Sequence, residues 1–403
     1  MKNWGLSPIS IIKMKLTQML PIAIAFYLLT SIISISASQS FLFLAFILWV
    51  ILLIKEKKLP SFPSFFWPLL VYAGLSLIAS FLSRNPETSL KDSRELLLFL
   101  VVPIAYTGFR IEKEIKRANL AFLASAYLSI GFSFVYFILK AAPGERIKGF
   151  MGHYMTQAGL LLLFSAVALS ITVFSRDKTR IFWGIGFGLA LAALLLTLTR
   201  NAWIGLIVAV GVVIYLYKPR ALIALPLVVG LLFAISPGQV KKRALSIFST
   251  KTFSNRQRIE YIHAGIKIIK DYPLFGTGPN TVDVVFQYPK YGLSEEAKKN
   301  VHLHNNFVQI AAERGIPALF SWLAFLIWIF FSLIKLLKNK DPAIFSLAAG
   351  ALAALFALIA AGFFEYNFGD SEVTTLFLYL MTIPFTLERL RKAPVMIPIM
   401  NKE

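Results

Sequence analysis

The sequence predicts an all-α, polytopic membrane protein with about twelve transmembrane helices and one long polar loop on its outer face. Three observations lead to this prediction. The 403 residues are 57% hydrophobic and 15% charged, which is too apolar for a soluble domain. Apolar runs near the length that crosses about 30 Å of hydrocarbon recur along the chain. Between these runs, basic residues gather in short clusters.

Each apolar run is expected to form one transmembrane helix. The twelve runs are residues 17–35, 41–54, 65–82, 96–108, 120–139, 158–174, 181–199, 202–217, 221–235, 316–337, 342–364 and 373–387. The chain would therefore have three parts. Residues 1–236 would hold helices one to nine, residues 237–305 the large loop, and residues 306–403 the last three helices and a tail.

The Lys and Arg clusters alternate along the chain in the way that the positive-inside rule requires. The clusters assigned to the cytoplasm lie within residues 2–15, 55–58, 110–117, 176–180, 218–220, 335–340 and 389–392. Both termini are then cytoplasmic, and no cleavable signal peptide is needed. The net charge of +21 follows from this topology better than from a nucleic-acid-binding face. The outer side receives the loop at 140–157, Arg200, the long loop and the acidic turn at 365–372.

The long outer loop carries more positive charge than its side of the membrane favours. Between Gly238 and Asn305 there are eleven Lys and Arg residues against five Asp and Glu residues. One interpretation is a solvated loop rich in Lys. The other is an anion site for a ligand that carries phosphate, since Arg suits two-pronged contacts with phosphate oxygens.

Local patterns place the loop's candidate residues. Ser254 can cap a helix that runs to about Lys270, lies on the membrane and carries Arg256 and Arg258 in its first turn, with Glu260 nearby. Its apolar stripe is Ile259, Ile262, Ile266 and Ile269.

A second helix is expected to start at Ser294 and to run through His304 to Arg314, before Gly315 ends it. It would place His302 and His304 on different sides. Because the chain also has no cysteine and no HExxH motif, no metal site is expected. The Gly276-Thr277-Gly278 sequence lacks the rest of a Walker motif and is interpreted as a turn.

Arg200 lies at the outer end of an apolar run, three residues before Trp203. An arginine that extends to the interface beside a tryptophan is common at helix ends. Arg200 also lies on the same side as Arg256 and Arg258, which favours a shared anion site.

Several motifs in fixed order resemble the O-antigen ligase family and its polymerase relatives. They are Thr199-Arg200-Asn201-Ala202-Trp203-Ile204-Gly205, then Arg258-Ile259-Glu260 leading to Asp271-Tyr272-Pro273-Leu274-Phe275-Gly276-Thr277-Gly278-Pro279, and then His304-Asn305 with Gly315 ten residues later. The resemblance covers about a third of the chain, from Arg200 to about Leu319.

The resemblance implies a GT-C-like, metal-independent, inverting glycosyltransferase. It would move a glycan from undecaprenyl pyrophosphate to a sugar hydroxyl of lipid A core oligosaccharide, at the periplasmic face of a bacterial inner membrane. Arg200 and Arg258 match the family arginines that hold the donor pyrophosphate, and His304 matches the histidine that activates the acceptor. We assign Arg256 to the donor site as well, with His302, Asn305 and Glu260 as supporting residues.

The residue types suit this chemistry without a cofactor or a metal. Pyrophosphate is a good leaving group, so the reaction needs positive charge at the departing oxygens and a base for the attacking hydroxyl. Histidine, with an ordinary pKa near 6.5, can be that base.

Two other interpretations remain open. An O-antigen polymerase or a protein O-oligosaccharyltransferase would use the same lipid-linked donor with another acceptor. A secondary transporter or flippase would be expected to carry ionisable residues at mid-membrane and related halves. The predicted spans carry almost no charge and show no internal repeat, which favours an enzyme.

Overall fold

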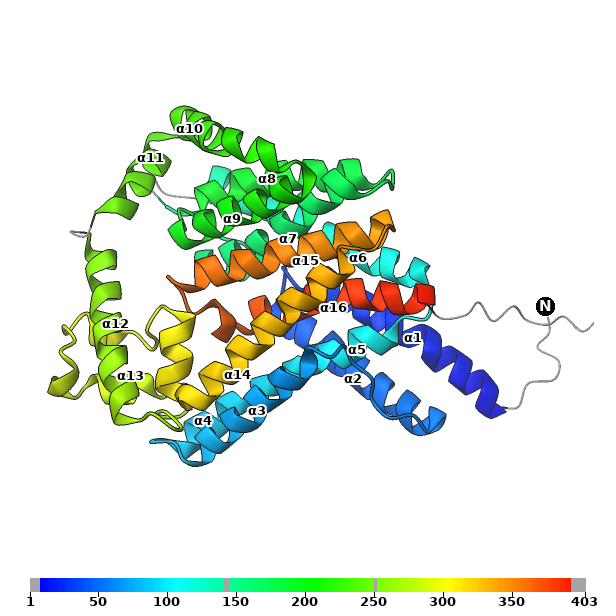
Figure 1. The fold of residues 1–403 in the computed structure, drawn as a ribbon, viewed down its shortest axis with the longest axis horizontal. Helices are drawn as coiled ribbons and strands as arrows, with labels where there is room; N and C mark the ends of the chain where they lie inside the picture. The colour runs from blue at the N-terminus through cyan, green and yellow to red at the C-terminus, as the bar shows by residue number, and fades with distance from the viewer. Residues whose placement is uncertain (1–7, 141–144, 250–251, 393–403) are drawn as a thin grey trace, which may run out of the picture.

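The computed structural model describes residues 8–140, 145–249 and 252–392, and within these ranges it contains helices and no strand (Figure 1). The α-helices are α1 (Pro8–Thr30), α2 (Ile35–Glu56), α3 (Phe66–Phe81), α4 (Pro86–Asp92), α5 (Val101–Gly108), α6 (Glu112–Lys140), α7 (Tyr154–Phe174), α8 (Arg180–Leu196), α9 (Arg200–Tyr217), α10 (Leu225–Ile235), α11 (Gly238–Leu245), α12 (Phe253–Asp271), α13 (Val282–Phe286), α14 (Asn306–Leu336), α15 (Pro342–Gly362) and α16 (Ser371–Lys392). The 3-10 helices are η1 (Ser93–Leu100), η2 (Pro219–Ala224), η3 (Ser246–Phe248), η4 (Pro289–Tyr291), η5 (Ala297–Lys299) and η6 (Asn367–Gly369).

The predicted all-α class is confirmed, and every predicted apolar run falls on helix. Among the described residues, six helices are long and apolar enough to cross a membrane, namely α2, most of α6, α7, α9, α14 and α15. Four shorter apolar helices cover Leu16–Thr30, Phe66–Phe81, Arg180–Leu196 and Pro219–Ile235. The protein is therefore a multi-pass membrane protein by length and composition. The full count of twelve crossings stays a prediction.

The run at residues 96–108 was expected to be one helix and is instead divided. The 3-10 helix η1 covers its first part, and α5 begins only at Val101. Pro103 lies in the first turn of α5, where its missing N–H is not needed. Further along an α-helix, proline would clash with the carbonyl four residues earlier, so the break before Pro103 is a local steric effect.

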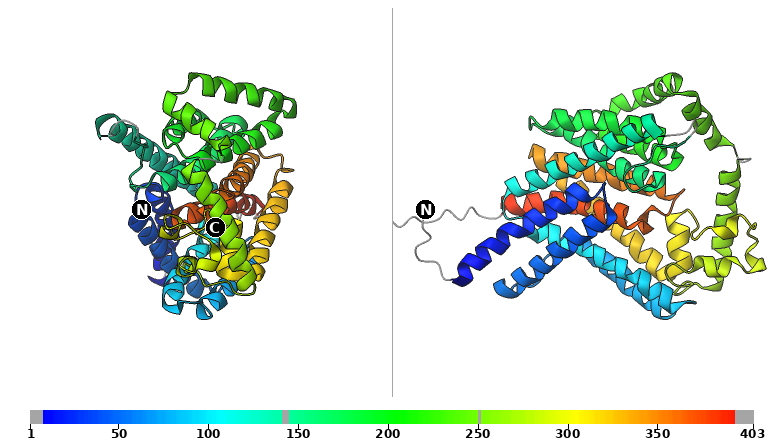
Figure 2. Two further views of the ribbon diagram at one scale, coloured as in Figure 1. Left: turned by 90° about the vertical axis from the view of Figure 1, so that its left-hand side faces the viewer. Right: turned by 180° about the vertical axis from the view of Figure 1, so that it is seen from behind.

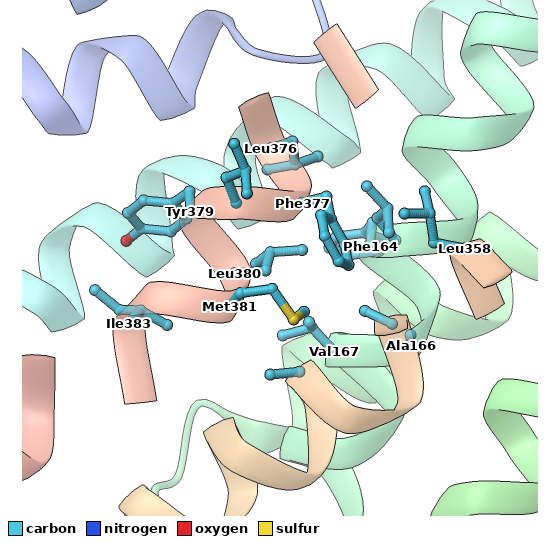
Figure 3. Close-up of a cluster of buried hydrophobic side chains, with 14 of the residues drawn as sticks. Phe164, Ala166, Val167, Leu358, Leu376, Phe377, Tyr379, Leu380, Met381 and Ile383 are labelled. Carbon is cyan, nitrogen blue, oxygen red and sulfur yellow. The ribbon is translucent and has the colours of Figure 1, made fainter. Parts of the chain in front are cut away.

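The centre of the molecule is formed by α7, α15 and α16. Most side chains of α7 and α15 are buried, and α15 packs against both α7 and α9. Figure 3 shows part of this core, where Phe164 and Val167 meet Phe377, Leu380 and Met381. Small residues let these helices approach closely, as Gly205 of α9 lies directly against the backbone carbonyl of Ala357.

The long polar segment lies across one end of the bundle, where α12 runs crosswise to the apolar helices (Figures 1 and 2). The first described residues of α1 and the last of α16 lie at the opposite end (Figure 1). The buried face of α12 consists of Tyr261, Ala264, Gly265 and Ile268. Of the predicted isoleucine stripe, Ile259, Ile262 and Ile266 remain exposed. Helix α12 thus has two apolar faces, one packed inward and one free to meet lipid, and its position on the membrane stays a prediction.

The turn after α12 is locked onto α14. The amides of Thr277 and Gly278 donate to the carbonyls of Ala312 and Glu313, each at 2.9 Å, and the amide of Ile316 donates to Pro273 at 2.8 Å. Gly276 (φ +66°) and Gly278 (φ +106°) have the left-handed backbone of the predicted turn. Gly315 (φ +83°, ψ 169°) interrupts the helical backbone of α14, and a Cβ there would collide with the carbonyl of Leu274.

Candidate active site

A large cavity opens at the polar end of the bundle. It has a volume of about 880 Å³ and is lined by the first turns of α7, α9 and α12, the end of α15, and the connections before α14 and after α15. Its lining includes the predicted residues Arg200, Arg258, His302 and His304. Residues as far apart in the sequence as Glu95 and Val373 therefore meet in one site.

Four arginines line one side of the cavity: Arg146, Arg200, Arg243 and Arg258. Within the part of the chain that the structure describes, none of them forms a salt bridge with a carboxylate. We call these four residues the basic wall. Uncompensated guanidinium groups in a confined cavity form a strong site for a multiply charged anion.

Arg200 is buried and serves partly as a clamp. Its Nη1 donates to the Ser246 carbonyl at 2.8 Å, and its Nη2 donates to Ser254 Oγ at 2.8 Å and Asn255 Oδ1 at 2.6 Å. The interpretation as an arginine extending to the interface is thus wrong, because only 6% of Arg200 is exposed. Ser254 was expected to cap α12; instead that helix begins at Phe253 without a side-chain cap, and Ser254 binds Arg200.

Arg243 and Arg258 keep their terminal nitrogens available. Nε of Arg243 donates to the Leu198 carbonyl, and Nε of Arg258 donates to the Phe364 carbonyl, both at 3.1 Å. No hydrogen bond from their Nη atoms occurs among the described residues. Burial, with Arg146 and Arg258 nearby, lowers the pKa of Arg243. Burial also lowers the pKa of Arg258, with partial compensation from Glu365. A bound anion would favour the charged form of both guanidinium groups and so raise the pKa of Arg243 and of Arg258.

His304 lies on the cavity wall and contacts a carboxylate that the sequence did not single out. Its Nδ1 lies 3.0 Å from Glu365 Oε1 and 3.1 Å from Oε2. Burial by itself would raise the pKa of Glu365, but the hydrogen bond from His304 and the charges of His304, His302 and Arg258 lower it overall. An ionised carboxylate only accepts, so Nδ1 of His304 donates the proton of this hydrogen bond. In the neutral imidazole this leaves the lone pair that a base needs on Nε2.

The helix expected from Ser294 to Arg314 is wrong, and this error hid the arrangement of the histidines. The segment contains only the short η5 before α14 begins at Asn306, and His304 has a left-handed backbone (φ +51°). The cause is local competition for backbone groups. The Asn305 side chain caps α14 by accepting from Phe307 and Val308, and Gln309 accepts the Leu303 amide.

As a result, His302 and His304 lie together instead of on opposite helix faces. Their ring centroids are 4.3 Å apart, and ligand atoms of His302, His304 and Glu365 all lie within 4.8 Å of one another. The expectation that His302 and His304 lie on different sides of a helix is thus wrong. Nδ1 of His302 is buried and has no hydrogen-bond partner among the described residues. Burial lowers the pKa of His302, with partial compensation from Glu365. The neighbouring basic wall opposes a divalent cation in the same cavity.

Three predicted residues have other positions. Arg256 is exposed and does not line the cavity. Residues two apart on a helix point about 200° apart, so Arg256 and Arg258 cannot share one site. Glu260 accepts from the Ser294 hydroxyl at 2.7 Å and thereby holds the loop instead of lining the cavity. Asn305 caps α14 and donates to the Phe363 carbonyl at 2.9 Å, so it positions His304 from behind.

Sequence reasoning missed Arg146, Arg243 and Glu365 as site residues. Their one detectable signal was sidedness, because all three were assigned to the outer face. Nothing in their local pattern distinguishes Arg243 from Lys241 and Lys242, or Glu365 from the other acids of its turn. Contacts between distant segments select them: Arg243 donates to Leu198 just before α9, Ile147 next to Arg146 donates to Leu196, and α15 packs against α14 before Glu365.

The fold and the cavity define a multi-pass helical membrane protein with a cluster of arginines beside a histidine–carboxylate pair. Residues 185–323 match the family model described as O-antigen ligase. The predicted resemblance to the O-antigen ligase family is thereby confirmed over the region that contains Arg200, Arg258 and His304. Members of this family are glycosyltransferase-like membrane enzymes.

One relative was found in Haemophilus influenzae (strain ATCC 51907 / DSM 11121 / KW20 / Rd), where it is described as an uncharacterized protein. It is 24% identical to this chain over 322 residues, which cover 72% of this chain and 79% of the relative. The similarity thus extends well beyond the region that matches the family.

Proposed function

We propose that the protein is an O-antigen ligase, which transfers a glycan from undecaprenyl pyrophosphate to a sugar hydroxyl of lipid A core oligosaccharide. The observation that carries this proposal is one cavity that combines the basic wall with the His304–Glu365 pair. The family supports lipid-linked glycan and lipid A core substrates in general. We place the site at the periplasmic face of the inner membrane, with both termini in the cytoplasm.

The proposed step is a single displacement. The acceptor oxygen attacks the anomeric carbon, the bond from that carbon to the pyrophosphate oxygen breaks, and undecaprenyl pyrophosphate leaves. Attack from the opposite face inverts the anomeric centre. Nε2 of His304 takes the hydroxyl proton, and Glu365 stabilises the imidazolium that forms.

The leaving pyrophosphate is held by the basic wall. The terminal nitrogens of Arg243 and Arg258 supply two-pronged contacts, while Arg200 adds charge and fixes the start of α12. Positive charge arranged before the reaction stabilises the departing oxygens without reorganisation. In this mechanism the arginines do what a divalent metal does in other sugar transferases.

A second candidate, the O-antigen polymerase or protein O-oligosaccharyltransferase, uses the same donor and the same basic wall. It differs only in the acceptor, which would be another lipid-linked repeat unit or a protein hydroxyl. The family region supports the wider ligase and polymerase superfamily equally.

The test is the lipopolysaccharide banding pattern and the pool of undecaprenyl-linked glycan in a strain that lacks this protein. The strain is complemented with the wild type, His304→Ala or, as a control outside the cavity, Arg256→Ala. If the protein is a ligase, the strain that lacks it should contain bare lipid A core and accumulated lipid-linked polymer. The wild type and Arg256→Ala should restore glycan-capped lipopolysaccharide, and His304→Ala should not. Core capped by a single repeat would mean a polymerase, and unchanged pools would overturn both.

A further inference from the structure

A second polar cavity lies beside the arginine-lined one, between η1, the first part of α14 and the connection after α15. It has a volume of about 150 Å³. Its lining includes Asp92, Glu95, His302, Arg314 and Tyr366. We call this cavity the chamber. Within the described ranges, none of the four arginines of the basic wall lines it.

The chamber adjoins the active-site cavity on the side of the histidines. Five residues line both spaces: Glu95, His302, Tyr366, Gly369 and Ser371. The ring of His302 is also 4.3 Å from that of His304, measured between centroids. A ligand in the chamber would therefore lie one side chain away from the proposed base.

The size and the lining of the chamber suit one sugar ring. A cavity of roughly 150 Å³ accepts one six-membered ring. The apolar part of the lining includes Tyr72, Phe99 and Phe368, whose ring centroids lie 6.1–6.3 Å apart. Aromatic side chains beside a few convergent polar groups are typical of sites for small ligands. A pyranose matches this lining, because it has an apolar C–H face and hydroxyl groups around its edge.

Two buried nitrogen atoms of the lining side chains have no hydrogen-bond partner among the described residues, namely Nε of Arg314 and Nδ1 of His302. Arg314 is only 8% exposed, and its other nitrogens donate to Glu313, Tyr366 and Asp92. Buried polar atoms in native proteins are nearly always paired with protein or with another molecule. Since both side chains line the chamber, we expect ring hydroxyls to supply the missing partners.

The chamber is acidic, whereas the basic wall is positive. Asp92, Glu95 and Glu313 line the chamber, and Arg314 is the one Lys or Arg residue in its described lining. An ionised carboxylate accepts hydrogen bonds from hydroxyl groups and repels phosphate. The two neighbouring spaces therefore separate a neutral ring from an anionic pyrophosphate.

We propose that the chamber binds the terminal sugar ring of the acceptor, and that Glu95 makes it select a ring without negative charge. This inference rests on the proposed function and adds the chemical class of the acceptor's end. The donor's first sugar suits the chamber less well, because it is joined covalently to the pyrophosphate that the basic wall holds. A separate ring in the chamber would approach His304 from the histidine side of the cavity.

The first experiment compares two synthetic acceptors that differ only in one phosphate on the terminal ring, at saturating donor. The wild type should have the higher kcat/KM with the neutral acceptor. Glu95→Lys should lower this preference about tenfold, because it changes the charge beside the ring by two units. Glu87 of α4 is exposed and lines neither space, so Glu87→Lys is the matched control and should keep the preference. An unchanged preference in Glu95→Lys, or an equal change in both variants, would overturn the proposal.

The second experiment narrows the chamber from its exposed edge. Val301 lines the chamber and is 55% exposed, so Val301→Trp adds bulk there without entering the core. Val284 of α13 is 41% exposed and lines neither space, so Val284→Trp is its control. Val301→Trp should raise the acceptor KM about tenfold, the effect of one lost hydrogen bond to a charged group, and leave the donor KM unchanged. A rise in the donor KM alone would mean a donor sugar in the chamber and would overturn the acceptor assignment.

The third experiment needs no glycan transfer. Saturation-transfer NMR is measured on the protein in nanodiscs with methyl pyranosides of the gluco, galacto and manno configurations. At least one pyranoside should receive saturation and keep it in excess inorganic pyrophosphate, which occupies the basic wall. The signal should be lost in Val301→Trp and kept in Val284→Trp. No signal, or its displacement by pyrophosphate, would overturn the chamber as a sugar site.

The outcomes separate this proposal from the proposed function. A pyranoside signal that depends on Val301, without glycan transfer to lipid A core, would keep the chamber as a sugar site and overturn the ligase. Glycan transfer to lipid A core with none of the expected effects of Glu95→Lys and Val301→Trp would keep the ligase and overturn the chamber.

Discussion

The two sides of the candidate active-site cavity are built in different ways. Arg200, Arg243 and Arg258 of the basic wall belong to α9, α11 and α12, so regular helix backbone fixes their starting points. His304 and Glu365 lie in connections outside α14 and α15, and they depend on caps and on each other. The basic wall supplies charge with redundancy. On the other side, His304 is the one described histidine that forms a hydrogen bond with Glu365, while His302 lies 3.9 Å from the same carboxylate.

Replacing His304 with Ala should have the largest effect. Loss of the general base is expected to lower kcat about 10²- to 10⁴-fold, while the thermal unfolding temperature in detergent stays near that of the wild type. The assay is glycan transfer by the purified protein from undecaprenyl-linked donor to lipid A core. Near-normal turnover would exclude His304 as the base. It would also show that the His304–Glu365 side of the cavity tolerates the loss of one residue.

Glu365→Gln tests whether the carboxylate acts through His304. Removing a hydrogen bond to a charged group costs about 1.5–3 kcal/mol, so kcat should fall roughly 10- to 100-fold with little change in donor KM. Glu365→Asp, which keeps the charge, should recover part of the rate. A change confined to donor KM would contradict this role.

Arg258→Ala should cost less than either change in the pair, because three other arginines remain. We expect about a tenfold loss in kcat/KM, below the roughly 10²- to 10³-fold that is typical for a single preorganised donor. Arg258→Lys should restore little of it, since lysine cannot make the two-pronged contact. Full rescue by Lys would show that charge alone is needed. Activity should also survive EDTA, and loss on chelation with recovery on adding Mg²⁺ would overturn the metal-free mechanism.

Asp370, which also lines the cavity, should make stability depend on pH. Burial, followed by a hydrogen bond with Glu372, raises the pKa of Asp370 to about 8. A raised carboxyl pKa means that ionisation opposes folding, so stability should fall as the pH rises from about 4 towards 8 and then level off. Thermal melts of Asp370→Asn across this range should be flatter than those of the wild type, and parallel curves would contradict the shift.

Arg256→Ala should have the smallest effect. Its side chain is exposed and outside the cavity, so activity should change by no more than about twofold, in line with other surface substitutions. Measured beside Arg258→Ala, it separates a local site from a general effect of loop charge. Equal losses in the two variants would favour the general effect.

The contrast between residues on helices and residues in connections also decides how much could be predicted from the sequence. Apolar periodicity and composition predicted the helices. Arg200 and Arg258 could be found because they lie on the same side of the predicted topology and within recognisable motifs. The segment at 294–305 could not be predicted from its helical propensity. The Asn305 side chain caps α14, and Gln309 Oε1 accepts the Leu303 amide, so both side chains bind backbone amides around position 304 that a continuous helix would use. Glu365 became visible only when α15 was packed beside α14, since no local pattern records a contact across 61 positions.

The lock between the turn at 273–279 and α14 also sets an order of assembly. The amides of Thr277 and Gly278 have no acceptor until Ala312 and Glu313 are made. The Thr277 carbonyl accepts from the Arg84 amide, which is made 193 positions earlier. Every arginine of the basic wall is therefore synthesised before the segment that fixes the end of α12. A ribosome-bound chain that stops short of Ala312 would carry all four guanidinium groups before the end of α12 is fixed.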